Sequence, residues 1–221
     1  LDGKDAPLAR RQGVGVHVAL NVLTISGPIA VDMSVPTIPA ISATFGTGLR
    51  DGNNTVAFFL AGYAVSMFSL GSLSDALGRR PVLVYALCAY ILASILLSVV
   101  PTIGMLLWLR FIQGLVAGAP VVISQALVTE IWSNDEKALQ HASGLLATTR
   151  ALSAFVGPVI GAALAHYIHW RATFSAMATL ACLGLSLGLA LVPFPRRELL
   201  KNHVALVADL GQAVVSLMSD G

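Results

Sequence analysis

The chain has 221 residues, of which 56% are hydrophobic and only 11% carry a formal charge. A soluble domain is typically about 45–50% apolar and about 25% charged, so this composition excludes an ordinary soluble surface and indicates a chain that lies mostly in lipid. The net charge of +2 is too small to predict nucleic acid as a partner. Cys88 and Cys182 lie within apolar runs, so they predict neither a disulfide nor a metal site.

Six apolar runs are long enough to cross a bilayer, which takes about 17–25 residues in a helix. The sequence therefore predicts an all-α membrane protein with six transmembrane helices. The first run follows Arg10 and Arg11 as a signal peptide would, but its length and the spans after it indicate a retained helix. The predicted spans, in chain order, are 14–38, 56–73, 82–100, 103–128, 142–168 and 172–192.

The segments outside these spans are short. Residues 1–13 are predicted to be a cytoplasmic tail, residues 14–195 the six-helix unit, and residues 48–55 (GLRDGNNT) a turn with a helix start at an Asn or Thr. In residues 196–221, apolar residues recur at helical spacing after a basic start. That segment predicts either a linker helix on the cytoplasmic membrane surface or an exposed helix that packs on nothing.

Basic residues are distributed unequally between the two sides of the predicted spans. On the side of the N-terminus lie Lys4, Arg10, Arg11, Arg79, Arg80, Lys137, Arg196, Arg197 and Lys201. Only Arg50 and Arg171 lie on the other side, and Arg110 and Arg150 fall within spans. Lys and Arg concentrate in cytoplasmic loops, so both ends of this chain are predicted to be cytoplasmic.

The turn between the second and third spans reads GSLSDALGRRPVLV, from Gly71 to Val84. Gly71 would let two helix backbones approach closely, and Gly78 would take the left-handed conformation that ends a helix. Pro81 suits the first position of the next helix. Asp75 near a helix C-terminus opposes the helix dipole, so it needs a cationic partner.

The spacing G-x-L-x-D-x-x-G-R-R in this turn resembles the signature loop of the major facilitator superfamily. The resemblance implies a cytoplasmic latch, in which the acid and the basic residues tie the loop to neighbouring helices. Ala76 departs from the pattern, because many members carry a basic residue there. The latch residues implied here are Gly71, Asp75, Gly78, Arg79, Arg80 and Glu130.

Three further segments resemble the same superfamily. LRFIQGLVAGA (109–119) is similar to its R-x-x-Q-G motif, and GLLATTRALSAFVGPVIGA (144–162) to the helix-five motif of drug:proton antiporters. DMSVPTIPAIS (32–42) looks like the bicyclomycin/chloramphenicol-resistance (Bcr/CflA) branch. Small residues in the helix-five motif favour close packing of helices. Those predicted to pack in this way are Gly144, Ser153, Gly157, Pro158 and Gly161.

The resemblance implies the N-terminal half of a twelve-helix secondary active transporter in the inner membrane. The expected function is proton-coupled efflux of drugs or other small amphipathic molecules by alternating access, without a cofactor. Its partners would be the substrate, protons, the lipid bilayer and a C-terminal six-helix half. The alternatives are a proton-coupled uptake symporter of the same superfamily and a non-transporting six-helix membrane protein. A rhomboid-type membrane protease is disfavoured, because the segment ASG at 142–144 lacks the first Gly of G-x-S-G.

Ionisable side chains within spans are costly and predict function. Asp32 and Arg110 are expected about 10 Å below the outer surface, at matched depth, where they could pair. Asp32 would be the proton-coupling carboxylate and Arg110 would set its affinity; a helix-breaking role for Asp32 and a structural role for Arg110 are the alternatives. Arg150 would line the cavity or reach to the cytoplasmic interface. The predicted cavity residues are Asn21, Arg110, Gln113 and Arg150.

Overall fold

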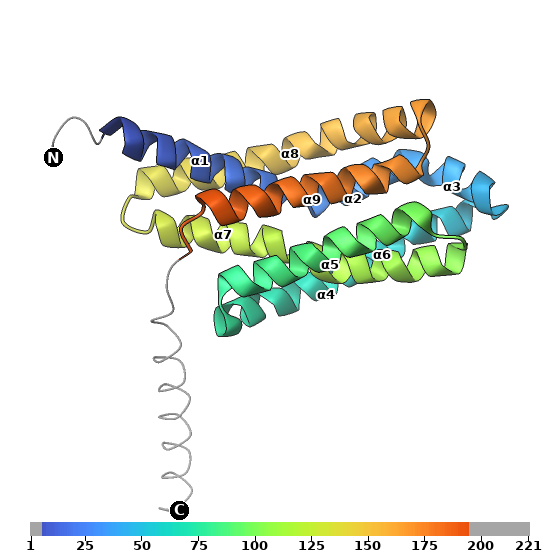
Figure 1. Ribbon diagram of the computed structural model, residues 1–221, viewed down its shortest axis with the longest axis horizontal. Coiled ribbons are helices and arrows are strands. Elements are labelled where there is room, and N and C mark those ends of the chain that lie inside the picture. The colour runs from blue at the N-terminus through green and yellow to red at the C-terminus, as the bar shows by residue number, and fades with distance from the viewer. Residues whose placement is uncertain (1–5, 195–221) are drawn as a thin grey trace, which may run out of the picture.

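The computed structural model describes residues 6–194, with side chains from residue 13 onward, and in this part the chain is a bundle of helices (Figure 1). The predicted linker at 196–221 and residues 1–5 of the predicted tail lie outside this description, and the rest of that tail is the start of α1. The helices in chain order are α1 (Ala6–Ile25), α2 (Pro28–Ser34), the short 3-10 helix η1 (Val35–Thr37), α3 (Ile38–Phe45), α4 (Leu49–Leu77), α5 (Arg79–Val99), α6 (Ile103–Ala117), α7 (Ala119–Ile131), α8 (Glu136–Tyr167) and α9 (Arg171–Leu191).

Five helical stretches are long and apolar enough to cross a membrane, and a sixth is obtained if one bent pair counts as a single span. The bent pair is 13–25 and 28–45, whose axes differ by 50°. α6 and α7 follow one another through Gly118 and together form one stretch, Ile103–Ile131. The prediction of six spans agrees with this architecture, with the first span broken.

The break in the first span follows from its sequence. Pro28 has no backbone N–H and cannot continue the hydrogen bonding of α1. Just before it, the Ser26 hydroxyl donates to the carbonyl oxygen of Leu23 at 2.7 Å, which closes the end of α1. Gly27 packs against the carbonyl oxygen of Ala117, where an added Cβ would collide. A helical face that begins on α1 therefore does not continue on α2.

The helix ends are set by glycines and polar caps. Gly46 (φ 64°, ψ 31°) ends α3 in the left-handed conformation. Gly78 separates α4 from α5 with a positive φ of 98°, but its ψ of 144° differs from the left-handed helical conformation predicted there. α8 begins because the side chain of Asp135 accepts from the backbone N–H of Ala138 at 3.0 Å. α5 begins at Arg79, so Pro81 lies in its first turn but not at its first position.

The predicted turn at 48–55 is wrong. α4 begins at Leu49, directly after the extended Gly48, so the Asn and Thr residues of that segment lie inside the helix. Gly46 reverses the chain within three residues, and a longer loop is not needed. α4 is consequently 29 residues long and runs the length of the bundle.

Two helix backbones approach closely where α4 crosses α6. A Cβ added at Gly62 would collide with the carbonyl oxygen of Phe111, and one added at Gly114 with that of Phe59. The expectation that Gly71 plays this part on α4 is wrong, since Gly71 faces only the side chain of Val122. Gly62 lies near the middle of α4, where the two helix axes are nearest.

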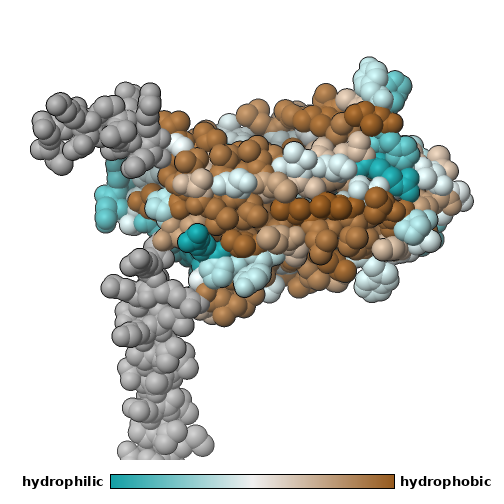
Figure 2. Space-filling view, in the orientation of Figure 1, coloured by the Kyte–Doolittle hydropathy of each residue, from teal (hydrophilic) through white to brown (hydrophobic). Residues whose placement is uncertain are grey.

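The outer surface of the bundle is apolar along its length and polar at its two ends (Figure 2). Large apolar side chains such as Tyr85, Leu92 and Trp108 are exposed at its surface. A chain in water would bury such a surface, whereas lipid tails cover it without cost. The surface therefore fits a protein that spans a membrane.

Candidate functional site

Arg110 on α6 is fully buried at the centre of the bundle. Its guanidinium donates to the Gln113 side-chain oxygen at 2.8 Å and to the Ser34 hydroxyl at 3.0 Å. Backbone carbonyls of Ala30 and Thr55 accept two longer bonds at 3.4 Å. The guanidinium also lies 4.5 Å from the ring centroid of Phe59 and 5.6 Å from that of Phe174.

The network around Arg110 continues to α5 through Gln113. The Gln113 amide donates to the Ser94 hydroxyl at 2.8 Å, which in turn donates to the carbonyl oxygen of Tyr90 at 2.7 Å. The Tyr90 hydroxyl donates to the carbonyl oxygen of Ser26 at 3.0 Å, at the break after α1. This chain of bonds joins α2, α5 and α6 and satisfies polar groups that have no access to water.

The predicted pairing of Asp32 with Arg110 is wrong. The ion pairs among residues 13–194 do not include either side chain. Asp32 instead packs over Gly157 of α8, and the hydroxyl of Ser153 lies within hydrogen-bonding reach of its carboxylate. The estimate of equal depth assumed that the first span is one straight helix. The chain is instead broken at Gly27 and Pro28, and the break turns the face of α2 that carries Asp32 toward α8.

Arg150 lies near the middle of α8 and is half-buried. Its guanidinium donates to the side-chain oxygen of Gln125 on α7 and to the carbonyl oxygen of Leu146, both at 3.4 Å. Arg150 therefore joins α8 to α7, and it is turned toward α7 rather than toward the end of α8.

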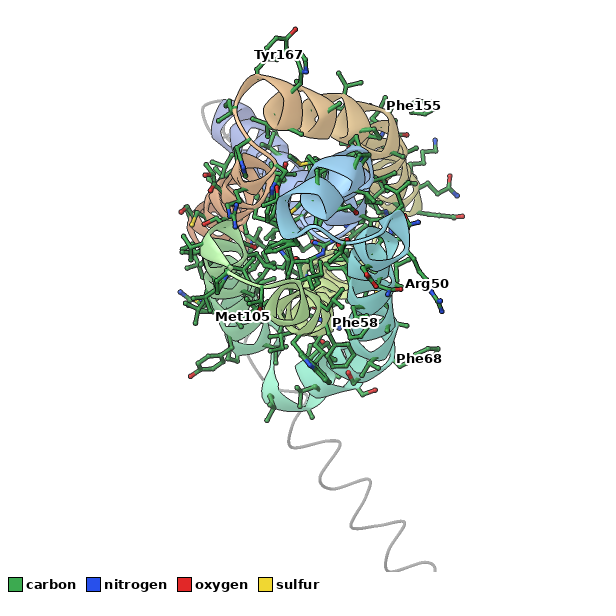
Figure 3. The ribbon with its side chains drawn as sticks, turned by 90° about the vertical axis from the view of Figure 1, so that its right-hand side faces the viewer. Arg50, Phe58, Phe68, Met105, Phe155 and Tyr167 are labelled. Atoms are coloured by element: carbon green, nitrogen blue, oxygen red, sulfur yellow. The ribbon has the colours of Figure 1, made fainter. Side chains whose placement is uncertain are left out.

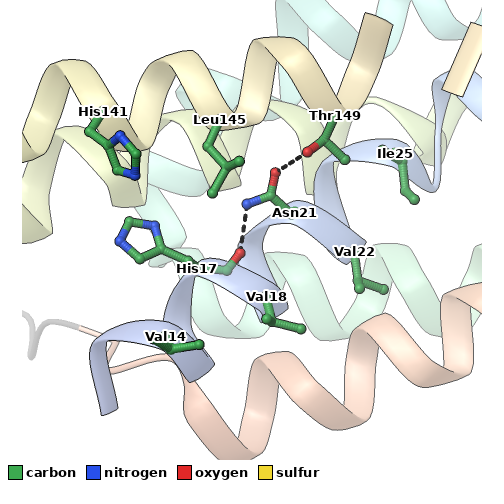
Figure 4. Close-up of a pocket in the computed structure, with 9 residues that line it drawn as sticks. All are labelled: Val14, His17, Val18, Asn21, Val22, Ile25, His141, Leu145 and Thr149. Atoms are coloured by element: carbon green, nitrogen blue, oxygen red, sulfur yellow. Dashed lines mark hydrogen bonds between the residues drawn. The ribbon is translucent and has the colours of Figure 1, made fainter. Parts of the chain in front are cut away.

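Asn21 lies elsewhere, on α1, where its side-chain oxygen accepts from the Thr149 hydroxyl of α8 at 2.5 Å. It lines a pocket of about 480 Å³ between α1 and α8, together with His17, His141 and apolar side chains (Figure 4). His17 stacks on Trp132 with ring centroids 4.5 Å apart. The four predicted cavity residues thus occupy three separate places: Arg110 with Gln113, Arg150 with Gln125, and Asn21 with Thr149.

The residues predicted to form a latch meet at the end of the bundle where α4 turns into α5. Arg79 pairs with Glu130 of α7 at 2.5 Å and with Asp75 at 3.1 Å, and its Nη1 donates to the Ser74 hydroxyl at 3.5 Å. Gly78 forms the turn. Arg80 is exposed and takes part in no ion pair of the described chain, and Gly71 lies about two turns back along α4. We call Asp75, Arg79 and Glu130 the latch triad.

The small residues of the helix-five motif lie partly at a helix interface. Ser153, Gly157 and Gly161 are buried against the α2 side of the bundle, and a Cβ added at Gly161 would collide with the carbonyl oxygen of Met33. Pro158 is half-buried within α8. Gly144 has nothing within 4 Å of the position of a Cβ, so among residues 6–194 it packs against no other helix.

Comparison with known proteins identifies the family. A family model described as the Major Facilitator Superfamily matches residues 20–216, which is most of the chain. The chain belongs to the major facilitator superfamily. This confirms the family predicted from the loop and helix motifs, and its members are transporters, not enzymes.

Relatives within the superfamily are named for drug resistance. A bicyclomycin resistance protein homolog of Haemophilus influenzae is 27% identical over 189 residues, which are 86% of this chain and 46% of that protein. A chloramphenicol resistance protein of Pseudomonas aeruginosa is 31% identical over 156 residues, which are 71% of this chain and 37% of that protein. The chain spans about half the length of the curated relatives it matches.

Solved structures share the superfamily fold. A crystal structure of a peptide transporter in complex with sulfate matches 92% of this chain and 45% of its own, with a TM-score of 0.69 and 16% sequence identity. At that identity the likeness shows the fold alone. The six-helix unit seen here therefore corresponds in fold to half of a longer superfamily member.

Several residues organise this superfamily unit in ways that were not predicted from the sequence. Trp170 is buried, and its indole N–H donates to the Thr44 hydroxyl at 2.8 Å. The adjacent Arg171 stacks on Trp170 at 4.4 Å and donates to the carbonyl oxygen of Val100 at 2.8 Å. Gln125 and Ser34 were likewise missed, and polar residues within apolar helices are the signal that could have found them.

Glu130→Gln is predicted to destabilise this superfamily unit more than Asp75→Asn. The Glu130 side chain is 27% exposed and accepts from both Nε and Nη2 of Arg79, whereas that of Asp75 is 61% exposed with one contact. We expect a loss of about 1–2 kcal/mol for Glu130→Gln and under about 1 kcal/mol for Asp75→Asn. Thermal unfolding in detergent at low and high salt measures both, and equal effects would contradict this ranking.

Proposed function

We propose that this chain is the N-terminal half of a proton-coupled transporter that exports drugs or other small amphipathic molecules. The observation that carries the proposal is the placement of Asp32 and Arg150. Both are ionisable, half-buried and within apolar helices, and neither takes part in an ion pair in the part of the chain that the structure describes. Charged side chains in membrane helices face a bundle interior or a water-filled cavity, so this side of the bundle is suited to a polar transport path.

The proposed cavity requires a second half. The chain spans about half the length of its curated relatives, and superfamily substrates bind between two six-helix units. Phe68 of α4 and Phe155 of α8 project from the same side of the bundle (Figure 3). Such exposed aromatic side chains, together with the open position at Gly144, would pack against the C-terminal half. Alternating access would then arise from rocking of one half against the other.

The names of the relatives favour export over uptake, because they refer to drug resistance. Proteins named for bicyclomycin and chloramphenicol resistance match 86% and 71% of this chain, and resistance is a consequence of removing a drug. The helix-five motif with its buried Ser153, Gly157 and Gly161 supports the same direction. A proton-coupled uptake symporter is the alternative.

We infer that the latch end of the bundle faces the cytoplasm. Arg79, Arg80 and Lys137 lie at this end, whereas Arg50 and Arg171 lie at the other end. The positive-inside rule then orients the unit in the inner membrane with both chain ends cytoplasmic. The latch triad would hold the cytoplasmic ends of α4, α5 and α7 together and release them during the transport cycle.

Within this proposal Asp32 takes and releases the coupling proton, and Ser153 is its immediate neighbour. Arg110 is fully buried, so it would not contact the substrate. Arg110 and Gln113 would act indirectly, because their hydrogen bonds fix the position of α2 relative to α6. Arg150 would contact the substrate directly. Asn21 would fix α1 against α8 through Thr149.

The decisive experiment compares efflux by this chain alone with efflux by the same chain joined to its C-terminal six-helix half. Everted membrane vesicles would be given chloramphenicol or a dye in the external medium and an imposed pH gradient, and accumulation of the compound in the vesicle lumen would be measured. We expect pH-driven transport only from the joined protein. Transport in the uptake direction would favour the symporter, and equal transport by residues 1–221 alone would exclude the half-transporter proposal.

A further inference from the structure

The bundle contains two arginines within the membrane, and their surroundings differ. Arg110 is fully buried and is held by bonds of 2.8 and 3.0 Å and by two aromatic rings. Arg150 is half-buried, and both of its acceptors lie at 3.4 Å. Hydrogen bonds from a guanidinium to a well-placed acceptor are usually about 2.7–2.9 Å long, so Arg150 is only weakly engaged. The guanidinium of Arg110 is thus bonded to well-placed acceptors, whereas that of Arg150 retains N–H groups that could donate to a ligand.

The groups around Arg150 are also donors. The oxygen of the Gln125 amide accepts from Arg150, which leaves the two N–H groups of that amide. Donors from α7 and α8 therefore lie together here, and no carboxylate of residues 13–194 forms an ion pair with Arg150.

An arginine that simply reached to the membrane surface would not be arranged in this way. Arg150 lies 14 residues after Glu136, the first residue of α8, which is about 20 Å along the helix. Its guanidinium is bonded across to Gln125 on a neighbouring helix instead of lying free at the helix end. Burial of a cation at this depth without a carboxylate partner costs free energy, and an anionic ligand that paired with Arg150 would offset that cost.

We propose that Arg150 and Gln125 form a subsite for an anionic oxygen group of the transported molecule. The proposal rests on the transporter function proposed above and specifies its substrate class. That class is a small apolar molecule with a carboxylate, which accepts from Arg150 Nη1 and from the N–H groups of the Gln125 amide. A cationic drug would be repelled at this place by Arg150.

The test uses a matched pair of probes, 2-naphthoate and its neutral amide 2-naphthamide. Their binding to the transporter in lipid nanodiscs is measured by equilibrium dialysis. We expect the wild type to bind the carboxylate about tenfold more tightly than the amide, as a charge-assisted hydrogen bond allows. Arg150→Gln should reduce the ratio to about one, and Arg150→Lys should keep part of it. Arg50→Gln, which removes an exposed cation at the start of α4, should leave it unchanged.

A preference that persists in Arg150→Gln, or that is absent from the wild type, would overturn the subsite. Gln125→Ala provides a second route if Arg150→Gln does not fold, and it should lower the ratio. The pH-driven efflux assay is run on the same preparations. Efflux without a carboxylate preference would remove the subsite and leave the transporter function intact. A carboxylate preference without efflux would remove the transport function and leave an anion-binding site.

Discussion

Gly114→Ala is expected to lower the unfolding temperature of the six-helix unit more than any other single methyl group added to α6. The new Cβ would collide with the carbonyl oxygen of Phe59 and lie 2.9 Å from the backbone nitrogen of Tyr63. Both obstacles are backbone atoms of a long helix, so neither can rotate away as a side chain can. α4 and α6 would have to move apart along their whole crossing.

The expected loss is about 3 kcal/mol, at the upper end of what overpacking costs, because the contact is backbone to backbone. Separation of the helices would also stretch the bond from Arg110 to the carbonyl oxygen of Thr55, already 3.4 Å long. For a chain of this size the unfolding temperature should fall by roughly 6–12 °C. Thermal unfolding in detergent, followed by circular dichroism or by loss of monodisperse protein, measures the change.

Gly104→Ala is the matched control. It lies in the first turn of the same helix, and nothing lies within 4 Å of the position of its Cβ. Replacing Gly by Ala in an open helical position is neutral or stabilising by up to about 1 kcal/mol. If Gly114→Ala and Gly104→Ala unfold at the same temperature, the tight crossing of α4 and α6 is wrong.

The sequence alone predicted most of the architecture, because each span is a long apolar run bounded by charged or glycine-containing turns. It also predicted the latch triad as a group, although Arg79 and Glu130 are 51 residues apart in the chain. That long-range contact came from the resemblance to the superfamily and not from spacing. Local signals placed the helix ends less well, as the start of α4 at Leu49 illustrates.

The positions of charged groups within the bundle could not be predicted from depth alone. Two residues at equal depth meet only if their helical faces point at one another, and the break at Gly27 and Pro28 decides the face of α2. The glycine at the α4–α6 crossing was missed for a related reason. Gly62 and Gly71 are indistinguishable by sequence, and only the crossing point of the two axes separates them.

Asp32→Asn is expected to abolish transport that follows the pH gradient while leaving substrate binding in place. An amide has nearly the shape of a carboxyl group but cannot release a proton, so the site would be held in one charge state. Proton uptake on one side and release on the other would no longer accompany the conformational change. In everted vesicles of the complete transporter, efflux should no longer respond to an imposed pH gradient.

The surroundings of Asp32 indicate how its protonation would be transmitted to α8. The Ser153 hydroxyl has one hydrogen, which it donates to the carbonyl oxygen of Arg150 at 2.8 Å. A protonated Asp32 can donate to Ser153 and leave that bond in place. An ionised Asp32 needs a donor, and the Ser153 hydroxyl can supply one only by turning away from Arg150. Loss of the proton would thus change a bond at the residue proposed to hold the substrate.

Two further variants separate this mechanism from a simple loss of charge. Asp51→Asn removes an exposed acid from the first turn of α4 and should leave pH-driven efflux unchanged. Ser153→Ala keeps the carboxylate but removes the hydroxyl, so it should preserve proton coupling and weaken the effect of pH on substrate affinity. If Asp32→Asn retains pH-driven efflux, the coupling carboxylate lies in the C-terminal half. If Ser153→Ala binds substrate with the wild-type pH dependence, Asp32 acts on the cavity without passing through Arg150.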